Sequence, residues 1–128
     1  METRPNRSGH FLHGTLQTFE WHEVINWLRA ETQSRQKNHN ALTLVKNEAL
    51  SVVMLYFQKE AQMHEHHAPG QFTLTVLEGR INFLLYLKSE TISTELSQGQ
   101  LLVLEEPTPH AIIALEESAF LLTIIAAR

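Results

Sequence analysis

The sequence predicts a single all-β domain, a barrel or sandwich, preceded by a short α-helix. From Ala41 onward, short segments rich in Leu, Val, Ile, Thr, Phe and Tyr are separated by turn residues about every ten positions, as in β barrels and sandwiches. Apolar and polar residues alternate between 72 and 87, which is typical of strands with one buried face. Ahead of Ala41, apolar residues recur with a helical period instead. The length of 128 residues suits one domain that needs no disulfide to hold its core.

The first 15 residues are predicted to form a flexible N-terminal arm. They are mostly polar, and Pro5, Gly9 and Gly14 interrupt any regular period. Terminal segments that bury little apolar surface are usually poorly ordered. The second predicted unit, 16–40, consists of a helix and its connector to the β domain.

A helix is predicted over 18–32, where one apolar stripe has the spacing i, i+3, i+4 and i+7. Thr18 is a suitable N-cap, and glutamates in the first turns interact favourably with the helix dipole. The polar segment 33–40 then connects the helix to the β domain. We expect the stripe to pack against that larger unit. Its members are Trp21, Val24, Ile25 and Leu28.

The third predicted unit, 41–128, is the β domain itself. Glu78 and Gly79 form a hairpin signal between two of its strands. Large aromatic residues within the strands are expected in the core, with one or two of them lining a ligand pocket at the mouth of a barrel. These aromatic residues are Tyr56, Phe57, Phe72, Phe83, Tyr86 and Phe120. The predicted strands span 42–46, 50–58, 62–66, 72–78, 80–87, 91–96, 101–104, 111–114 and 120–126.

The composition excludes several classes of site. The chain has no cysteine, all 14 of its acidic residues are glutamates, and it has eight histidines. A Ser-His-Asp triad, a thiol nucleophile, a CxxC redox pair, a cysteine-containing zinc finger and an EF-hand loop are therefore absent. The chemistry that remains available rests on histidine, glutamate, hydroxyl groups and bound metal.

The net charge is −4, and no basic stripe of the kind that follows a phosphate backbone is visible. We therefore expect no nucleic-acid partner. No apolar run reaches the roughly 18 residues of a membrane helix, and no signal peptide is recognisable. The sequence accordingly predicts a cytoplasmic protein with no membrane partner.

Two histidine-containing segments predict a metal site. His64 and His66 are two residues apart in a predicted strand, so they share one face while His67 projects from the other. Neutral imidazoles in this arrangement can bind one ion at about 2.0–2.2 Å, and an antiparallel strand can supply a third ligand from far along the chain. His110 is the candidate for that third ligand.

The segment around His64 resembles the first motif of the cupins, small β barrels of the jelly-roll class. That motif reads G, five residues, H-x-H, three or four residues, E, six residues, G. Here His64-Glu65-His66 is followed by four residues, then Gln71, and then the turn that ends in Gly79. The position of the motif's glutamate is thus assigned to Gln71.

The segment before His110 resembles the second cupin motif, which reads G, five residues, P-x-G, two residues, H, three residues, N. It is matched by Gly99, the turn at 105–109 and His110, while Ala114 replaces the asparagine. The resemblance covers about 41–128. It implies a cupin-type double-stranded β-helix, or jelly-roll, barrel with a short N-terminal α-helix.

The resemblance also implies a divalent metal inside the barrel, held by His64, His66 and His110, with Gln71 or water completing the set. An amide oxygen adds no negative charge, which favours Zn, Fe, Ni or Cu over Mn. Three imidazoles leave coordination positions open for water, O2 or a chelating substrate. A metal-dependent dioxygenase or isomerase acting on a small molecule in the barrel is therefore one expectation. No catalytic residue is assigned.

The alternative is a non-catalytic cupin that binds or senses a small molecule, with a degenerate or empty metal site. Gln71 and Ala114, which both depart from the motifs, favour it. In either case we expect a homodimer, because many small cupins are dimers and because the edge strands of an open jelly roll need covering.

Overall fold

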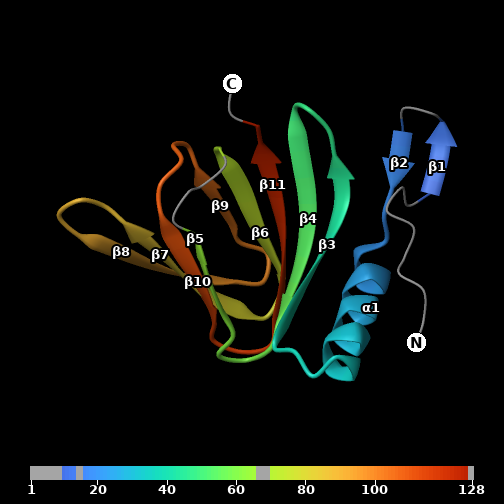
Figure 1. The fold of residues 1–128 in the computed structure, drawn as a ribbon, viewed down its shortest axis with the longest axis horizontal. Coiled ribbons are helices and arrows are strands. Elements are labelled where there is room, and N and C mark those ends of the chain that lie inside the picture. The colour runs from blue at the N-terminus through green and yellow to red at the C-terminus, as the bar shows by residue number, and fades with distance from the viewer. Residues whose placement is uncertain (1–9, 14–15, 66–69, 127–128) are drawn as a thin grey trace.

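The computed structural model describes residues 10–13, 16–65 and 70–126. Two antiparallel sheets face each other, and a helix covers the outer side of the larger sheet (Figure 1). This arrangement confirms the predicted all-β architecture with one N-terminal helix. The larger sheet has the order β3 (His39–Lys46), β4 (Leu50–Phe57), β11 (Ser118–Ile125), β6 (Phe72–Glu78) and β9 (Leu101–Leu104). The smaller sheet has the order β5 (Gln62–Glu65), β10 (His110–Ala114), β7 (Arg80–Tyr86) and β8 (Thr91–Ser97).

The predicted strands of the β domain all occur, with ends that differ by a few residues. The strand predicted at 62–66 is described as far as Glu65, and His66 and His67 lie outside the described residues. Several strands that neighbour each other in a sheet come from distant parts of the chain. The β10 strand, for example, lies between β5 and β7. This topology brings His110 next to a segment more than forty residues earlier in the sequence.

The turn at Gly79 does not form the predicted hairpin. The strands that it joins, β6 and β7, belong to different sheets, so the turn carries the chain from one face of the barrel to the other. Gly79 has φ +83°, and a Cβ atom there would clash with the carbonyl oxygen of Glu117. Only glycine combines this backbone conformation with such a close approach.

The N-terminal region differs from its prediction in two respects. Strand β1 (His10–His13) lies within the segment predicted as a flexible arm and pairs with β2 (Leu16–Thr18). Helix α1 (Trp21–Ser34) begins three residues later than predicted, because Glu20 and not Thr18 caps it by accepting a hydrogen bond from the His22 backbone. None of the helices in the described part of the chain is long and apolar enough to cross a membrane.

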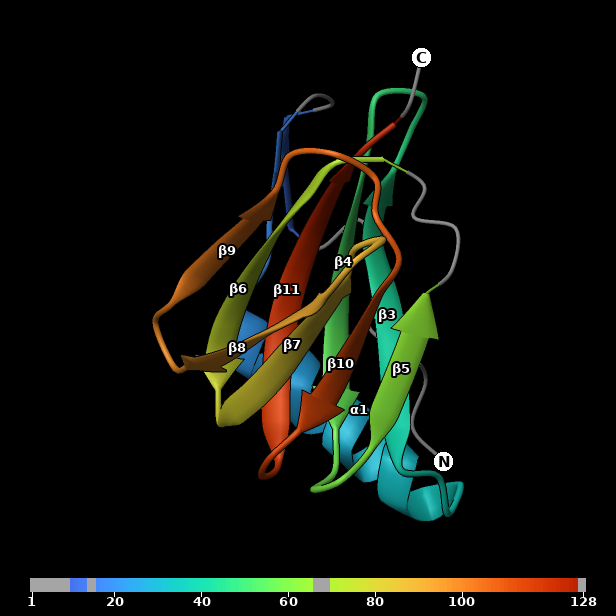
Figure 2. The same cartoon turned by 90° about the vertical axis from the view of Figure 1, so that its left-hand side faces the viewer.

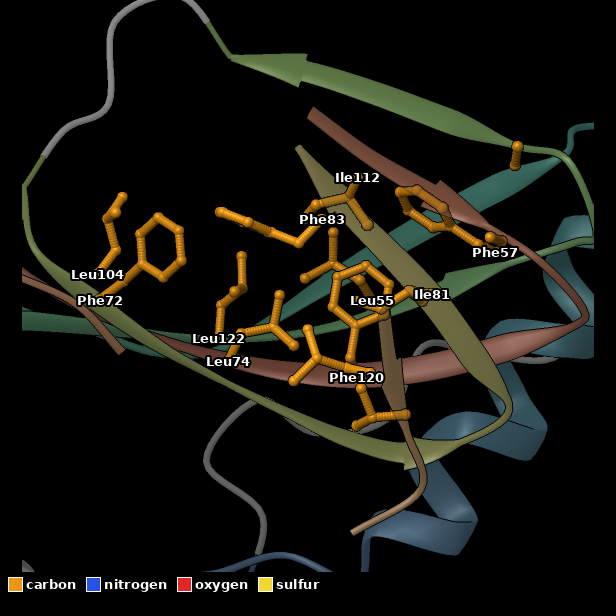
Figure 3. Packing of buried hydrophobic residues seen from close by; sticks show 14 residues of the cluster. Leu55, Phe57, Phe72, Leu74, Ile81, Phe83, Leu104, Ile112, Phe120 and Leu122 are labelled. Atoms are coloured by element: carbon orange, nitrogen blue, oxygen red, sulfur yellow. The ribbon is translucent and has the colours of Figure 1, made fainter. Parts of the chain in front are cut away.

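Two apolar cores stabilise the fold. The first, between α1 and the outer face of the larger sheet, includes Ile25, Leu28 and Tyr56, which are almost completely buried. The second fills the barrel between the two sheets (Figure 3). Its centre contains fully buried side chains from both sheets, namely Phe57, Leu74, Val76, Ile81, Ile112 and Phe120. The aromatic residues predicted in the core are buried there or under α1, except Tyr86, which is partly exposed.

Candidate functional site

A row of inward-facing side chains crosses the smaller sheet at one end of the barrel. In an antiparallel sheet, residues directly opposite each other project from the same face. The register pairs His110 with Glu65 on one side and with Leu85 on the other, and it pairs Leu85 with Ile92. His110 faces inward, because its ring contacts Phe72 of the opposite sheet. Glu65, Leu85 and Ile92 therefore face the interior too.

A second row, on the larger sheet, faces the first. Ser51 pairs with Lys46 and with Ile124, Ile124 pairs with Phe72, and Phe72 pairs with Leu104. The two rows meet where the rings of Phe72 and His110 lie 5.1 Å apart at 62°. Deeper rows belong to the filled core described above. We call the nine residues of these two rows the barrel mouth.

Ile92 is 41% exposed although it lies on the inner face of its sheet. The neighbouring strands explain this exposure, because β8 and β9 are edge strands of different sheets and diverge from the turn that joins them (Figure 2). Leu85, which pairs with Ile92, is likewise only partly buried. The interior of the barrel is thus accessible to solvent along this side of the mouth.

His110 is held in a defined orientation and tautomer. Its Nδ1 lies 2.8 Å from the carbonyl oxygen of Thr108. A carbonyl oxygen only accepts hydrogen bonds, so Nδ1 carries the hydrogen, and in the neutral ring Nε2 has the free electron pair. The ring is only 5% exposed and stacks on Phe83, with 5.3 Å between centroids and 17° between planes. His110 therefore offers one fixed acceptor atom within an apolar environment.

The structure does not bring His64 or Gln71 to His110. His64 pairs with Ala111, so it lies on the face opposite His110; it is exposed, and its Nε2 is 3.2 Å from Gln62 Oε1. Gln71 is exposed as well and directly precedes the inward-facing Phe72. His66 lies outside the described residues. Within 10–13, 16–65 and 70–126, no group of three or more histidine or acidic side chains is placed to hold a metal.

The spacing to Gly79 explains this difference. The first motif has six residues between its glutamate and its last glycine, whereas seven separate Gln71 from Gly79. Counted back from Gly79, the glutamate position falls on Phe72, and the two histidine positions then fall on Glu65 and His67. The assignment of Gln71 was thus shifted by one residue, which in a strand exchanges the two faces. The distance to the turn glycine was the signal that could have corrected it.

The donor atoms at the mouth do not by themselves fit a resident metal. A catalytic zinc usually has three protein ligands, and the described rows offer the Glu65 carboxylate and His110 Nε2. Phe72, at the position of the family's carboxylate ligand, has no donor atom and packs edge-on against the imidazole. What the rows do provide is an apolar wall with two hydrogen-bond acceptors.

A polar cluster that the sequence did not reveal joins α1 to the barrel. Arg29 donates to Glu78 at 2.9 Å and to Glu117 at 3.2 Å, and the hydroxyl of Tyr56 also donates to Glu117. The Tyr56 hydroxyl and then Arg29 lower the pKa of Glu117 from its usual value, while burial and the bond to Glu117 raise the pKa of Tyr56 to about 12. This cluster fixes the helix on the sheet.

Comparisons with known proteins agree on the fold. No protein-family profile matches the sequence, and no curated protein is recognisably similar to it. A cupin superfamily protein from Desulfitobacterium hafniense has a TM-score of 0.63 at 13% identity, with 70% of this chain and 78% of that chain covered. A conserved protein of unknown function from Streptococcus pyogenes has a TM-score of 0.64 at 24% identity, with coverages of 76% and 84%.

An iron(II)-loaded HppE enzyme, crystallised with an alternative substrate, is also similar, with a TM-score of 0.60 at 20% identity. The match covers 69% of this chain and 50% of that enzyme. Structures that share this architecture thus include both a metalloenzyme and a protein without a known activity. The two facing sheets, their strand pairing and these similarities together show that the chain has the cupin fold.

Proposed function

We propose that the protein is a non-catalytic cupin that binds a small molecule at the barrel mouth, with His110 in contact with the ligand. The observation that carries this proposal is the contact between Phe72 and His110. A phenyl ring occupies the position at which the cupin motif has a metal-binding carboxylate. Loss of that carboxylate removes both a ligand and the negative charge that would offset a divalent ion.

The character of the mouth supports ligand binding. Small-molecule sites are usually concave and mostly apolar, with a few fixed polar groups that orient the ligand. Phe72 and Leu104 form one wall, Leu85 and Ile92 form the other, and His110 supplies a fixed acceptor between them. The His110 residue is buried and its ring is held by the bond to Thr108, so its orientation is fixed before a ligand arrives.

A metal-dependent enzyme is the second candidate, and one observation favours it. The hydrogen bond from Nδ1 to Thr108 leaves Nε2 free, which is how metal-binding histidines are commonly oriented. Glu65 lies directly opposite His110, and His66 and His67 follow Glu65 in the sequence. In this second candidate, one or both of these histidines would join Glu65 and His110 as metal ligands. If a metal is bound, Zn, Fe, Ni or Cu would supply Lewis-acid or dioxygen chemistry for an isomerase or a dioxygenase.

Metal content distinguishes the two candidates. Untagged protein is purified without chelator, and its metals are quantified by mass spectrometry for wild type, His110→Ala and His39→Ala. His39 is an exposed histidine at the start of β3, the end of that strand farthest from the mouth, so its variant controls for adventitious binding. We expect well below one ion per chain in all three proteins and no effect of EDTA on the melting temperature. One ion per chain that His110→Ala alone loses would support the metalloenzyme instead.

A further inference from the structure

We infer that the ligand of the barrel mouth is a small organic amine in its ammonium form, carried on a flat apolar body. This inference rests on the proposed function and specifies the ligand class of the same site. It follows from the acceptors at the mouth, the charges in its two rows and the depth to which the barrel is filled.

The mouth offers acceptors where a ligand would enter. Glu65 and His110 are directly opposed across β5 and β10 and project from the same face. The bond to Thr108 fixes the hydrogen of the neutral His110 ring on Nδ1, so its inward-facing nitrogen accepts. An ammonium group has several donor hydrogens and no acceptor, so it can bond to the carboxylate and to the imidazole together. A carboxylate or phosphate ligand would meet acceptors at both positions.

The negative charge of Glu65 also favours a cationic ligand. Glu65 is the acidic residue of the two rows, and Lys46, which pairs with Ser51 at the end of the row on the larger sheet, is exposed. An anion bound between Glu65 and His110 would be close to the Glu65 carboxylate. A cation would form a charge-assisted hydrogen bond, which is shorter and stronger than a neutral one. The ring faces of aromatic residues add attraction for a cation, and Phe72 lines this mouth.

The deeper interior limits the size of the ligand. Below the mouth, the barrel is filled by buried side chains that include Leu74, Phe83 and Ile112 (Figure 3). A ligand therefore occupies the outer layer, with its apolar body against Phe72 and Leu104. A single aromatic ring with a short amine arm can contact this apolar wall and offer its ammonium group to the two acceptors.

Three probes with the same ring test the ligand class: benzylamine, benzyl alcohol and benzoate. Each is titrated into the full-length, EDTA-dialysed, 15N-labelled protein, and binding is followed by chemical-shift changes. Three proteins are compared: wild type, Glu65→Gln, and Glu90→Gln as a control with the same loss of charge on an exposed turn. We expect wild type to bind benzylamine at least about tenfold more tightly than benzoate, because a bond to a charged group contributes more than a neutral one.

In Glu65→Gln we expect the benzylamine affinity to fall about tenfold, with benzyl alcohol changed less than about twofold, while Glu90→Gln resembles wild type. A wild-type preference for benzoate, or equal binding of all three probes, would overturn the amine inference while the proposed function stands. An amine preference that survives in Glu65→Gln would overturn the role of Glu65. If none of the probes shifts the signals of the mouth, the proposed function fails as well.

Discussion

Glu65 and His110 lie directly opposite each other in the antiparallel pair of β5 and β10, so both side chains project into the mouth of the barrel. The two residues are far apart in the sequence, and the topology of the smaller sheet brings them together. Phe72 from the opposite sheet lies against the same imidazole. These three side chains are the basis of the proposed function, and each can be tested separately.

Phe72→Glu is expected to create a metal site. The new carboxylate would join Glu65 and His110, which gives the three donors that a metal centre usually needs. We predict at least about tenfold tighter Zn²⁺ binding than in wild type. Loss of the buried ring should also lower the stability of the metal-free variant by about 3–5 kcal/mol. Calorimetric titration and chemical unfolding measure both effects.

Phe72→Gln is the matched control. It removes the same ring as Phe72→Glu and introduces a side chain of the size of glutamate but without its charge. It should be destabilised to a similar extent and should bind Zn²⁺ more weakly than Phe72→Glu. Equal Zn²⁺ affinity in the two variants would show that residue 72 is not at the ligand position of the motif.

The two turn glycines provide a matched pair of substitutions. Both have positive φ, +83° at Gly79 and +89° at Gly99, but a Cβ at Gly99 would meet no atom within 4 Å, whereas one at Gly79 would clash with the backbone of Glu117. Gly99→Ala should therefore lower the free energy of unfolding only by the backbone strain, about 1–2 kcal/mol. Gly79→Ala should cost at least about twice as much. Urea unfolding measures both, and equal costs would contradict the close packing at Gly79.

Much of the fold could be predicted from the sequence because strand alternation and helical period are local signals. The alternation at 72–78 and the apolar run at 101–104 predict those strands with correct ends. The site was harder to predict, because a shift of one residue moves every side chain to the other face of a strand. Counting from the histidines selected Gln71, and counting from Gly79 selects the inward-facing Phe72.

Other features depend on contacts between distant residues. Tyr56 and Glu117 are 61 positions apart, and no local pattern indicates that their side chains form a hydrogen bond. The register that opposes Glu65 to His110 is likewise set by the assembled sheet. Strand β1 was missed because glycine and proline around it obscure its pattern, and pairing with β2 stabilises it nonetheless.

The bond between Tyr56 and Glu117 predicts how stability depends on pH. Glu117 has a lowered pKa when folded, mainly because of the Tyr56 hydroxyl, so its contribution is present above its unfolded value near 4.5 and is lost as the pH falls through the lowered folded value. Tyr56 has a pKa raised from 10.0 to about 12, mainly by burial, so its contribution is present below pH 10.0 and is lost as the pH rises toward 12.

Tyr56→Phe removes this bond and should lower the free energy of unfolding by about 1–2 kcal/mol near neutral pH. The difference between wild type and variant should shrink at both ends of the pH range. Chemical unfolding at several pH values measures it. A difference that is constant from acid to alkaline pH would contradict the coupling between the two groups.

The edge strand β9 is where we expect a second copy of the chain to bind. Its two outward-facing residues, Leu101 and Val103, are 59% and 57% exposed, and the strand carries no charged residue that would discourage pairing. Antiparallel pairing of two β9 strands across a two-fold axis would cover both. Val103→Lys should therefore convert a dimer into a monomer in light-scattering measurements. Thr91→Lys, on the edge strand β8 of the smaller sheet, is the control, and a wild-type monomer would contradict the prediction.

The most direct test of the central claim is a ligand titration monitored at the His110 imidazole in metal-free protein. Whichever benzyl probe binds most tightly is added to EDTA-dialysed protein, and the two ring nitrogens are followed by 1H–15N correlation. We predict that the Nε2 signal shifts to saturation while Nδ1 keeps its hydrogen, and that His110→Gln abolishes the binding. Binding that appears only after one metal ion per chain has been added would contradict the account.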